Sequence, residues 1–388
     1  MTAILLFAAT LLLAVLISER ARRSIVSTAV LFLAVGFLGG AFGLAGLRPT
    51  ADEVARLSEI ALFAVLFTDG MLIGVRELAG AWRLPGRALL LGFPLTLGAI
   101  AVLARYVTGL PWLEAFLTGA VLAPTDPLFA AAIVGREEIP SRVRTLLNVE
   151  SGLNDGLALP IVVVLVSLGG AREAAVGEVL GEAGLGVVVG ASVSTAAVLL
   201  LRSSFFRPSP RYESLGALAV GVLVFAVASL THANEFLAAF AAGVALATVG
   251  PDVRDAFHDI GDVVTELLKL AALLVFGALI SGRFLVEVGI PGWIFALLVL
   301  VVARPAALAV ALVRSGLDRR ERFTVAWFGP KGFASVVYGL LVVGAGIPLG
   351  GQVFHVVAAA VALSMVLHST TDVPIARAFE RADSGGAP

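Results

Sequence analysis

The sequence predicts an all-α polytopic membrane protein of about thirteen transmembrane helices, on the grounds of composition, hydropathy and the placement of arginine. Of its 388 residues, 59% are hydrophobic and only 14% are charged, whereas a soluble domain carries about 25% charged residues. The chain has no cysteine, which excludes disulfides and thiolate chemistry. It has no Walker loop, dinucleotide-binding glycine pattern or zinc-protease motif. No cofactor and no ATP-driven step are therefore expected.

Thirteen stretches approach the length of about 20 largely apolar residues that a spanning helix needs. They lie near 2–17, 25–46, 55–74, 88–108, 113–134, 142–168, 181–202, 213–230, 234–250, 262–281, 292–314, 323–345 and 351–370. No basic region precedes the first stretch, and its arginines follow the apolar run, so a retained helix is expected rather than a signal peptide. Residues 373–388 are expected to form a short cytoplasmic tail, with no soluble domain at either end.

The arginines provide a test of this number of spans. Successive loops between the spans must lie on opposite sides of the membrane. The loops of one side, together with the carboxyl-terminal tail, hold nineteen arginines, and the loops of the other side hold five. Cytoplasmic loops carry the excess of basic residues in membrane proteins. The amino terminus is therefore expected outside and the carboxyl terminus in the cytoplasm, with the chain in the cell (inner) membrane.

An odd number of spans lets two six-helix halves lie in opposite senses about a linker helix, which is the inverted-repeat plan of secondary transporters. On this plan residues 1–372 form one transmembrane transporter unit. The first repeat covers about 2–168, the linker helix about 181–202 and the second repeat about 213–370.

Two spans at matching places in the halves are interrupted. Span 5 contains APTDP at 123–127, and span 12 contains GPKG at 329–332. Proline lacks an N–H and disfavours helix at the residue before it, and matched interruptions of this kind indicate a transport site. Asp126 and Lys331 are expected to compensate the partial charges of the helix ends at the two breaks.

Span 6 carries two carboxylates in an apolar run, where an ionisable group is costly and usually functional. At 100° per residue, Ser151 and Asp155 share one face of this helix, while Glu150 and Asn154 share another. Asp155 is therefore expected in a cavity, and Glu150 is expected to face a neighbouring helix.

Oxygen ligands suit hard monovalent cations. Asp155, Asp126, Thr125 and Ser151 supply such oxygens, together with the carbonyl groups freed at the broken helices. Asn154 is predicted with these four residues in the ion- and proton-binding site. A carboxylate in a partly dry cavity can also hold a proton. Competition between a cation and a proton for Asp155 is enough to couple two opposite flows.

Glu150 is predicted to be structural, because a lone buried charge is costly. Its partner is Lys331 or Arg304, and of the two we expect Lys331. Arg304 is expected near Asn154 and Asp126, where it would balance the charge of the two breaks.

The other polar residues of the spans carry weaker signals. Asp69, between Thr68 and Gly70 in span 3, has no visible partner and is expected either to support access to the site or to lie near the cytoplasmic end. Lys269 is expected near the cytoplasmic start of span 10, one turn from Glu266. The four histidines near span ends are expected as interfacial polar groups: His232, His258, His355 and His368.

These motifs resemble the monovalent cation:proton antiporters, specifically the sodium/proton exchanger branch with its NhaP-type bacterial and archaeal members. The resemblance covers most of the chain. It is carried by TDP at 125–127, ESGLNDG at 150–156, EFLAAF at 235–240 with Gly243, RP at 304–305 and GPKG at 329–332. The first two are the most specific, because they lie at this spacing on adjacent spans.

The resemblance implies that the broken spans 5 and 12 cross in an ion-transporting core of spans 4–6 and 11–13. Spans 1–3 and 8–10 would form a scaffold through which a homodimer assembles. It also implies that Asp155 carries the cation or the proton, with Asp126, Thr125 and Ser151 helping. Spans 1–3 carry glycines suited to close helix contact: Gly36, Gly39, Gly40 and Gly43.

Family members with Asn before the Asp, as at Asn154, are typically electroneutral. One departure is Lys331, where the branch usually has arginine. The expected function is exchange of Na⁺, or Li⁺, for H⁺, with a role in pH homeostasis.

K⁺/H⁺ exchange on the same scaffold stays open, because a set of oxygen ligands does not fix the size of the ion. A cation channel is less favoured, since no filter motif is present. An intramembrane enzyme would need a general base near Ser151, and none lies at catalytic spacing. No enzymatic activity and no nucleic-acid partner are expected.

Overall fold

The computed structural model describes residues 2–21, 28–43, 51–71, 83–126, 139–169, 176–203, 205–206, 209–280 and 282–384. All regular secondary structure in these ranges is helical, which confirms the predicted all-α class. The first half contains α1 (Thr2–Ala21), α2 (Thr28–Ala41), α3 (Ala51–Met71), α5 (Arg83–Arg87), the π-helix η2 (Ala88–Gly92), α6 (Phe93–Leu103), the π-helix η3 (Ala104–Thr108), α7 (Trp112–Leu122) and α9 (Ser141–Gly169).

The remaining helices follow from residue 176. They are α10 (Val176–Leu201), α11 (Pro210–Leu230), α12 (Glu235–Val249), α13 (Pro251–Leu279), α14 (Gly282–Glu287), α15 (Gly289–Leu298), the π-helix η4 (Val299–Ala303), α16 (Arg304–Ala311), α17 (Arg319–Trp327), α18 (Phe333–Gly344) and α19 (Gly350–Ser384).

Several of these helices are suited to a membrane. In the described ranges five are long and apolar enough to cross one: Arg83–Thr108, Ser141–Gly169, Gly177–Leu201, Gly289–Ala311 and Gly350–Thr371. A sixth candidate joins α12 to the start of α13 through a bend of 115°. Each predicted span contains helix, but several of these helices are shorter than a full crossing. The number of thirteen spans therefore stays a prediction.

Helix boundaries differ most from expectation at two polar segments. The helix α13 begins at Pro251, well before the apolar run near 262, and α19 continues to Ser384, through most of the predicted tail 373–388. Hydropathy marks only the apolar part of a helix, whereas backbone hydrogen bonding continues through polar residues.

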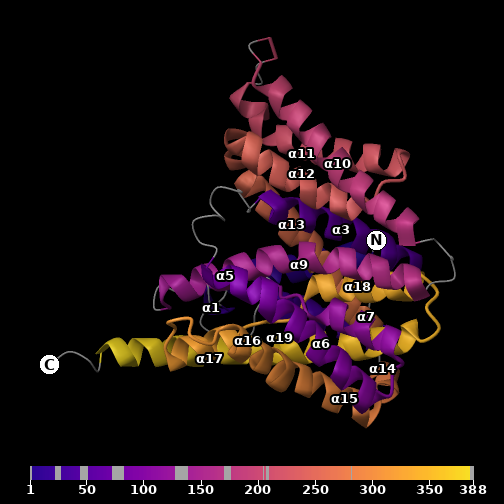
Figure 1. The fold of residues 1–388 in the computed structure, drawn as a ribbon, viewed down its shortest axis with the longest axis vertical. Helices are drawn as coiled ribbons and strands as arrows, with labels where there is room; N and C mark the ends of the chain where they lie inside the picture. The colour runs from indigo at the N-terminus through magenta and orange to yellow at the C-terminus, as the bar shows by residue number, and fades with distance from the viewer. Residues whose placement is uncertain are drawn as a thin grey trace.

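The helices pack in two groups, seen above and below α9 in Figure 1. The scaffold group consists of α2, α3 and α10 to α13, which contact one another. The core group consists of α6, α7, α9 and α15 to α19. The helices α9 and α18 also touch α3, so they form the boundary where the two groups meet.

Close crossings inside the scaffold group depend on glycine. A Cβ atom at Gly36 would overlap the carbonyl of Leu274 in α13, and one at Gly277 would overlap the carbonyl of Leu33 in α2. Gly40 packs against α13 in the same way. The predicted glycine face of the first spans thus makes a close contact, but the partner is a helix of the same chain. A dimer interface would have to use residues other than Gly36 and Gly40.

A π-helical segment precedes a proline in each of two spans that the sequence predicts as counterparts in the repeat. The π-helix η2 ends just before Phe93-Pro94, and η4 ends just before Arg304-Pro305. Proline cannot donate the regular helical hydrogen bond, and single π-turns often lie at functional sites. The second of these irregular turns positions Arg304.

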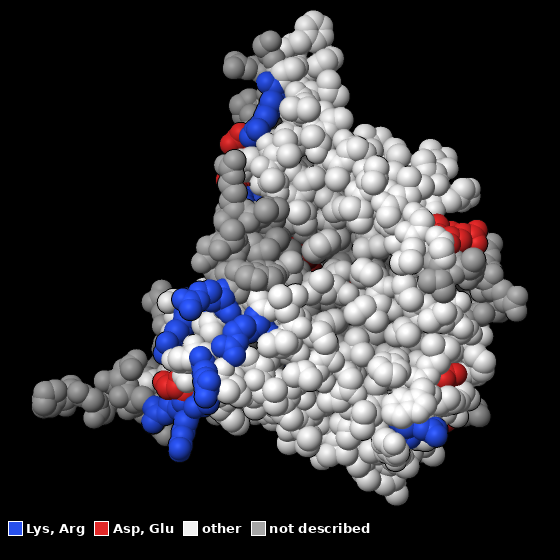
Figure 2. Space-filling view, in the orientation of Figure 1, with Lys and Arg blue, Asp and Glu red and all other residues white. Residues whose placement is uncertain are grey.

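The largest group of basic side chains lies at the lower left of a mostly uncharged surface, with smaller groups at the top and at the lower right (Figure 2). Two long-range contacts tie arginine-bearing helix ends together: Arg87 donates to the carbonyl of Val313, and Arg142 pairs with Glu321 at 2.6 Å. The arginines at these helix ends belong to the set that the sequence assigns to the cytoplasm.

Candidate functional site

The described residues contain the second predicted interruption and, at the first, the end of the preceding helix. The helix α17 ends at Trp327 and α18 begins at Phe333, so the GPKG motif at 329–332 is non-helical. In the first half, α7 ends at Leu122 and the residues up to Asp126 are non-helical. Residues 127–138 lie outside the described part of the chain, and the predicted crossing of the two broken helices falls on them.

The two interruptions are hydrogen-bonded to each other. The N–H of Asp126 donates to the carbonyl of Pro330 at 2.8 Å, and the N–H of Phe333 donates to Asp126 Oδ2 at 2.8 Å. Phe333 is the first residue of α18, so the carboxylate lies at the positive end of that helix dipole. Lys331 Nζ donates to the carbonyls of Ala123 and Pro124, both at 3.1 Å, at the negative end of α7. The charged side chain of each break therefore compensates the partial charge of the helix end at the other break.

The glycines of the second break are required by this packing. A Cβ atom at Gly332 would overlap the carboxylate of Asp126, and one at Gly329 would overlap the guanidinium of Arg304. The GPKG motif thus combines a proline that ends a helix with two glycines that let charged side chains approach the backbone.

Ser151 and Asn154 on α9 reach the first break through Thr125. The hydroxyls of Thr125 and Ser151 lie 2.9 Å apart, and Asn154 Nδ2 donates to Thr125 Oγ1 at 2.7 Å. All three side chains are buried. The structure therefore brings together these three polar residues that the sequence assigned to one site.

Asp155 lies on the same helix and is only 2% exposed. Among the described residues its Oδ1 atom has no hydrogen-bond partner, and the same is true of Asn154 Oδ1. Tyr338 of α18 donates to the backbone carbonyl of Asp155 at 3.0 Å, which fixes this turn of α9 without occupying the carboxylate. A buried oxygen of this kind is costly unless something binds to it.

The predicted pair of Glu150 with Lys331 is wrong. Arg304 donates to both oxygens of Glu150, at 2.8 and 3.1 Å, and also to the carbonyl of Phe328 at 3.1 Å. The planar guanidinium fits a carboxylate in this two-bond arrangement, whereas an ammonium acts as a point charge. Arg304 was expected near Asn154, and its hydrogen bonds are instead to Glu150 and the second break.

Sequence reasoning missed the position of two buried charges of the scaffold group. Asp69 on α3 and Lys269 on α13 are both buried, and both lie within electrostatic range of Asp126 and Asp155. The sequence did carry a signal for both residues, because each is an ionisable residue in an apolar run. Their convergence was not visible, since it depends on how α3 and α13 pack against the core group.

His368 is also buried, which corrects its expected interfacial place. Its Nε2 atom lies 3.0 Å from the carbonyl of Trp327, and its Nδ1 atom lies 3.0 Å from Ser364 Oγ. Ser364 Oγ in turn accepts from the N–H of Lys331 at 2.7 Å. This chain of contacts ties α19 to the end of α17 and to Lys331 within the second break. The side chain of His258 lies outside the described residues.

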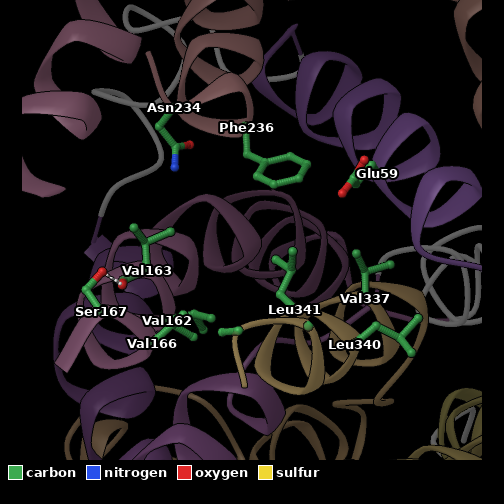
Figure 3. Close-up of a pocket in the computed structure, with 12 residues that line it drawn as sticks. Glu59, Val162, Val163, Val166, Ser167, Asn234, Phe236, Val337, Leu340 and Leu341 are labelled. Atoms are coloured by element: carbon green, nitrogen blue, oxygen red, sulfur yellow. Dashed lines mark hydrogen bonds between the residues drawn. The ribbon is translucent and has the colours of Figure 1, made fainter. Parts of the chain in front are cut away.

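A cavity of about 420 Å³ lies between α9, α18 and the scaffold helices. Figure 3 shows Glu59 and Phe236 beside it, with the hydroxyl of Ser167 bonded to the carbonyl of Val163. Phe240, one turn along α12 from Phe236, packs its ring where a Cβ at Gly156 would lie. Phe236 of α12 thus lines this cavity, and Phe240 of the same helix packs against the turn of α9 that carries Asp155.

Comparison with known proteins places these features in a family. The family model described as "Sodium/hydrogen exchanger, transmembrane" matches residues 6–378. The K(+)/H(+) antiporter NhaP2 of Shewanella baltica is 25% identical over 364 residues, which is 91% of this chain and 62% of the relative. The K(+)/H(+) antiporter NhaP of Alkalimonas amylolytica is 28% identical over 374 residues, or 94% of this chain and 64% of the relative. The chain thus spans less than two thirds of the length of these relatives.

A solved structure shows the same fold. The sodium proton antiporter MjNhaP1 from Methanocaldococcus jannaschii at pH 8 matches with a TM-score of 0.78 and 20% identity, over 97% of this chain and 98% of that chain. Among the sequence relatives, the Na(+)/H(+) antiporter 2 of Zygosaccharomyces rouxii is 28% identical over 251 residues, or 59% of this chain and 31% of the relative. The cations named in these proteins are therefore both K⁺ and Na⁺.

Proposed function

The chain belongs to the sodium/hydrogen exchanger family, and on that premise we propose that it is a secondary antiporter exchanging a monovalent cation for H⁺ across the cell membrane. The observation that carries the proposal is the buried Oδ1 of Asp155, which has no hydrogen-bond partner in the described part of the chain. Asp155 follows directly on Asn154, one member of the cluster with Thr125 and Ser151 at the first interrupted helix.

The proposed mechanism is competition at Asp155. When the carboxylate is ionised it binds the cation, with the oxygens of Thr125, Ser151 and Asp126 as further ligands. When it is protonated it has no net charge and the cation leaves. Movement of the core group against the scaffold group exposes the site to each side in turn. Only the cation-bound and the protonated forms of the site move from one side of the membrane to the other, so the flow of cations is coupled to the flow of protons.

One carboxylate that carries either one cation or one proton exchanges equal charge. Asn154 adds no second titrating group, and Glu150 with Arg304 is neutral as a pair. We therefore propose electroneutral exchange. It predicts no transient current on a solid-supported membrane that scales with the cation concentration, and such a current would contradict it.

The wider arrangement is part of the same proposal. It comprises thirteen spans with crossed broken helices, an external amino terminus, a cytoplasmic carboxyl terminus and a homodimer formed through the scaffold group. The largest basic group in Figure 2 supports the assignment of the cytoplasmic side, because loops on that side carry the excess of arginine.

Na⁺ is the proposed cation, with Li⁺ as a substitute, and K⁺ is the second candidate. The observation that favours K⁺ is the naming of the bacterial relatives as K(+)/H(+) antiporters. The carboxylate and hydroxyl oxygens accept either ion, and ion size is not fixed by the kind of ligand.

Exchange in proteoliposomes tests the function and the ion together. A pH gradient is imposed, and NaCl, LiCl, KCl or choline chloride is added outside while internal pH is followed. Antiport predicts a saturable, cation-dependent collapse of the gradient with Na⁺ or K⁺ and none with choline. Cation flux that is independent of the pH gradient would instead indicate a channel, and no response to any cation would refute the proposed function.

A further inference from the structure

The proposed mechanism leaves two buried charges of the scaffold group unused. Asp69 on α3 is 4% exposed, and Lys269 on α13 is 7% exposed. Ionisable side chains at membrane depth are expensive and rarely incidental. Among the described residues, Asp69 Oδ2 has no hydrogen-bond partner.

The packing of α3 against α13 directs both residues to one place. Thr265 Oγ1 donates to Thr68 Oγ1 at 3.4 Å, which joins the two helices directly beside Asp69. Lys269 follows Thr265 by four residues, so it lies on the same face of α13, one turn further along. The two charges therefore face one region of the α3–α13 contact.

The turn of α3 that carries Asp69 packs through α12 against the turn of α9 that carries Asp155. A Cβ atom at Gly70 would overlap the carbonyl of Phe240, and one at Gly156, next to Asp155, would overlap the ring of Phe240. The charge of Lys269 interacts with those of Asp69, Asp126 and Asp155, and the charge of Asp69 interacts with those of Asp126 and Asp155. The other charged groups facing this part of the molecule are Glu266 and Asp262 on α13, and Lys331 at the second break. Three carboxylates and one lysine of the scaffold group thus interact electrostatically in this part of the molecule.

Such a cluster of carboxylates is chemically suited to a divalent cation. A fixed positive charge nearby opposes every cation, and the Coulomb energy is proportional to the charge of the ion. The free-energy penalty that this charge imposes on Mg²⁺ or Ca²⁺ is therefore twice the penalty that it imposes on Na⁺ or K⁺.

We propose that Lys269 is a specificity-determining residue, a tethered ammonium that excludes divalent cations from the site and keeps monovalent binding weak enough for release. Asp69 offsets part of its charge. The proposal rests on the proposed function only in that it uses the same cation site.

Binding in detergent tests the proposal without requiring transport. The affinities of NaCl, KCl, MgCl₂ and CaCl₂ are measured by titration calorimetry at alkaline pH for the wild type and Lys269→Met. Removing one positive charge is expected to tighten monovalent binding about tenfold and divalent binding about a hundredfold. Lys269→Arg is the matched control, because it keeps the charge and should bind each salt within about threefold of wild type.

A structural role for Lys269 would not produce this dependence on ionic charge. Equal changes for monovalent and divalent salts, no change, or the same change in Lys269→Arg would overturn the proposal. Asp69→Asn should act in the opposite direction and weaken divalent binding more than monovalent binding.

The double variant Lys269→Met with Asp69→Asn covers the case in which a single variant does not fold, because it leaves neither charge alone. Its affinities should lie between those of the two single changes, close to wild type. A double variant that binds as weakly as Asp69→Asn, or that also fails to fold, would overturn the proposal. If the expected binding pattern is found but the protein shows no exchange in proteoliposomes, the proposed function is refuted and the proposal for Lys269 is not.

Discussion

Glu150 and Asp155 are two carboxylates on the same helix, α9, and they are almost equally buried, at 3% and 2% exposure. Both oxygens of Glu150 accept hydrogen bonds from Arg304. Asp155 Oδ1 has no partner among the described residues. Burial therefore does not distinguish a structural carboxylate from a functional one. The difference lies in whether its hydrogen bonds are satisfied by the protein.

The same contrast extends to the surroundings of each residue. Arg304 is held by an irregular turn before Pro305 and by the carbonyl of Phe328, so the ion pair is part of the second break. Next to Asp155, Asn154 uses its amide nitrogen to bind Thr125, and within the described residues its Oδ1 stays unbonded. Both carboxylate oxygens of Glu150 are thus satisfied by the protein, whereas Asp155 Oδ1 and Asn154 Oδ1 can accept a ligand.

The largest expected effect comes from Asp155→Asn. It keeps the shape of the side chain and removes the group for which cation and proton compete, so exchange should fall to the level of empty liposomes. Expression and melting temperature in detergent should stay close to wild type. Asp252→Asn, at an exposed ion pair with Arg202, is the matched control and should exchange normally. Cation-driven proton movement retained by Asp155→Asn at any pH from about 6 to 9 would remove Asp155 from the mechanism.

Substitution of Glu150, unlike that of Asp155, should lower the stability of the protein. Glu150→Gln or Arg304→Met alone leaves a buried charge without its partner, which costs about 3–5 kcal/mol. The double change should recover much of that loss. Chemical unfolding in detergent measures the cycle, and the exposed pair of Arg202 with Asp252 serves as control with an effect below about 1 kcal/mol. Single variants that unfold like wild type would show that the pair does not stabilise the fold.

Gly332→Ala tests how closely the two breaks must approach. The new methyl group would overlap the carboxylate of Asp126, so a loss of about 1–3 kcal/mol is expected from overpacking, together with reduced exchange. Gly344→Ala at the other end of α18 meets no described atom within 4 Å and should have little effect. Equal behaviour of the two variants would mean that the contact at Asp126 is not tight.

The smallest effect is expected for Ser151→Ala. It removes one hydroxyl from the cluster with Thr125 while leaving the carboxylates in place. The KM for the cation should rise about fivefold, as expected for a net loss of about 1 kcal/mol, with the maximum rate little changed. Ser167→Ala, which removes a bond to the carbonyl of Val163 on the same helix, should leave the KM unchanged. An unchanged KM in Ser151→Ala would remove this hydroxyl from the site.

The sequence by itself determined the class of protein, the interruption at 329–332, the end of a helix before the first motif and the polar residue types of the site. These follow from local rules: apolar runs form membrane helices, proline and glycine end them, and a period of 3.6 residues sorts side chains onto faces. For this reason the end of a helix near 123 and the interruption at 329–332 could be predicted. Helical periodicity placed Ser151 and Asn154 on different faces, and the structure brings both to Thr125.

Only the tertiary structure decided which charges lie together. The pairing of Glu150 with Arg304 rather than Lys331 depends on where the second break passes relative to α9 and on the fit of a planar guanidinium to a carboxylate. The approach of Asp69 and Lys269 to the site depends on the crossing of α3 and α13 with the core group. Partners of this kind come from helices far apart in the chain, so hydropathy and periodicity carry no information about them.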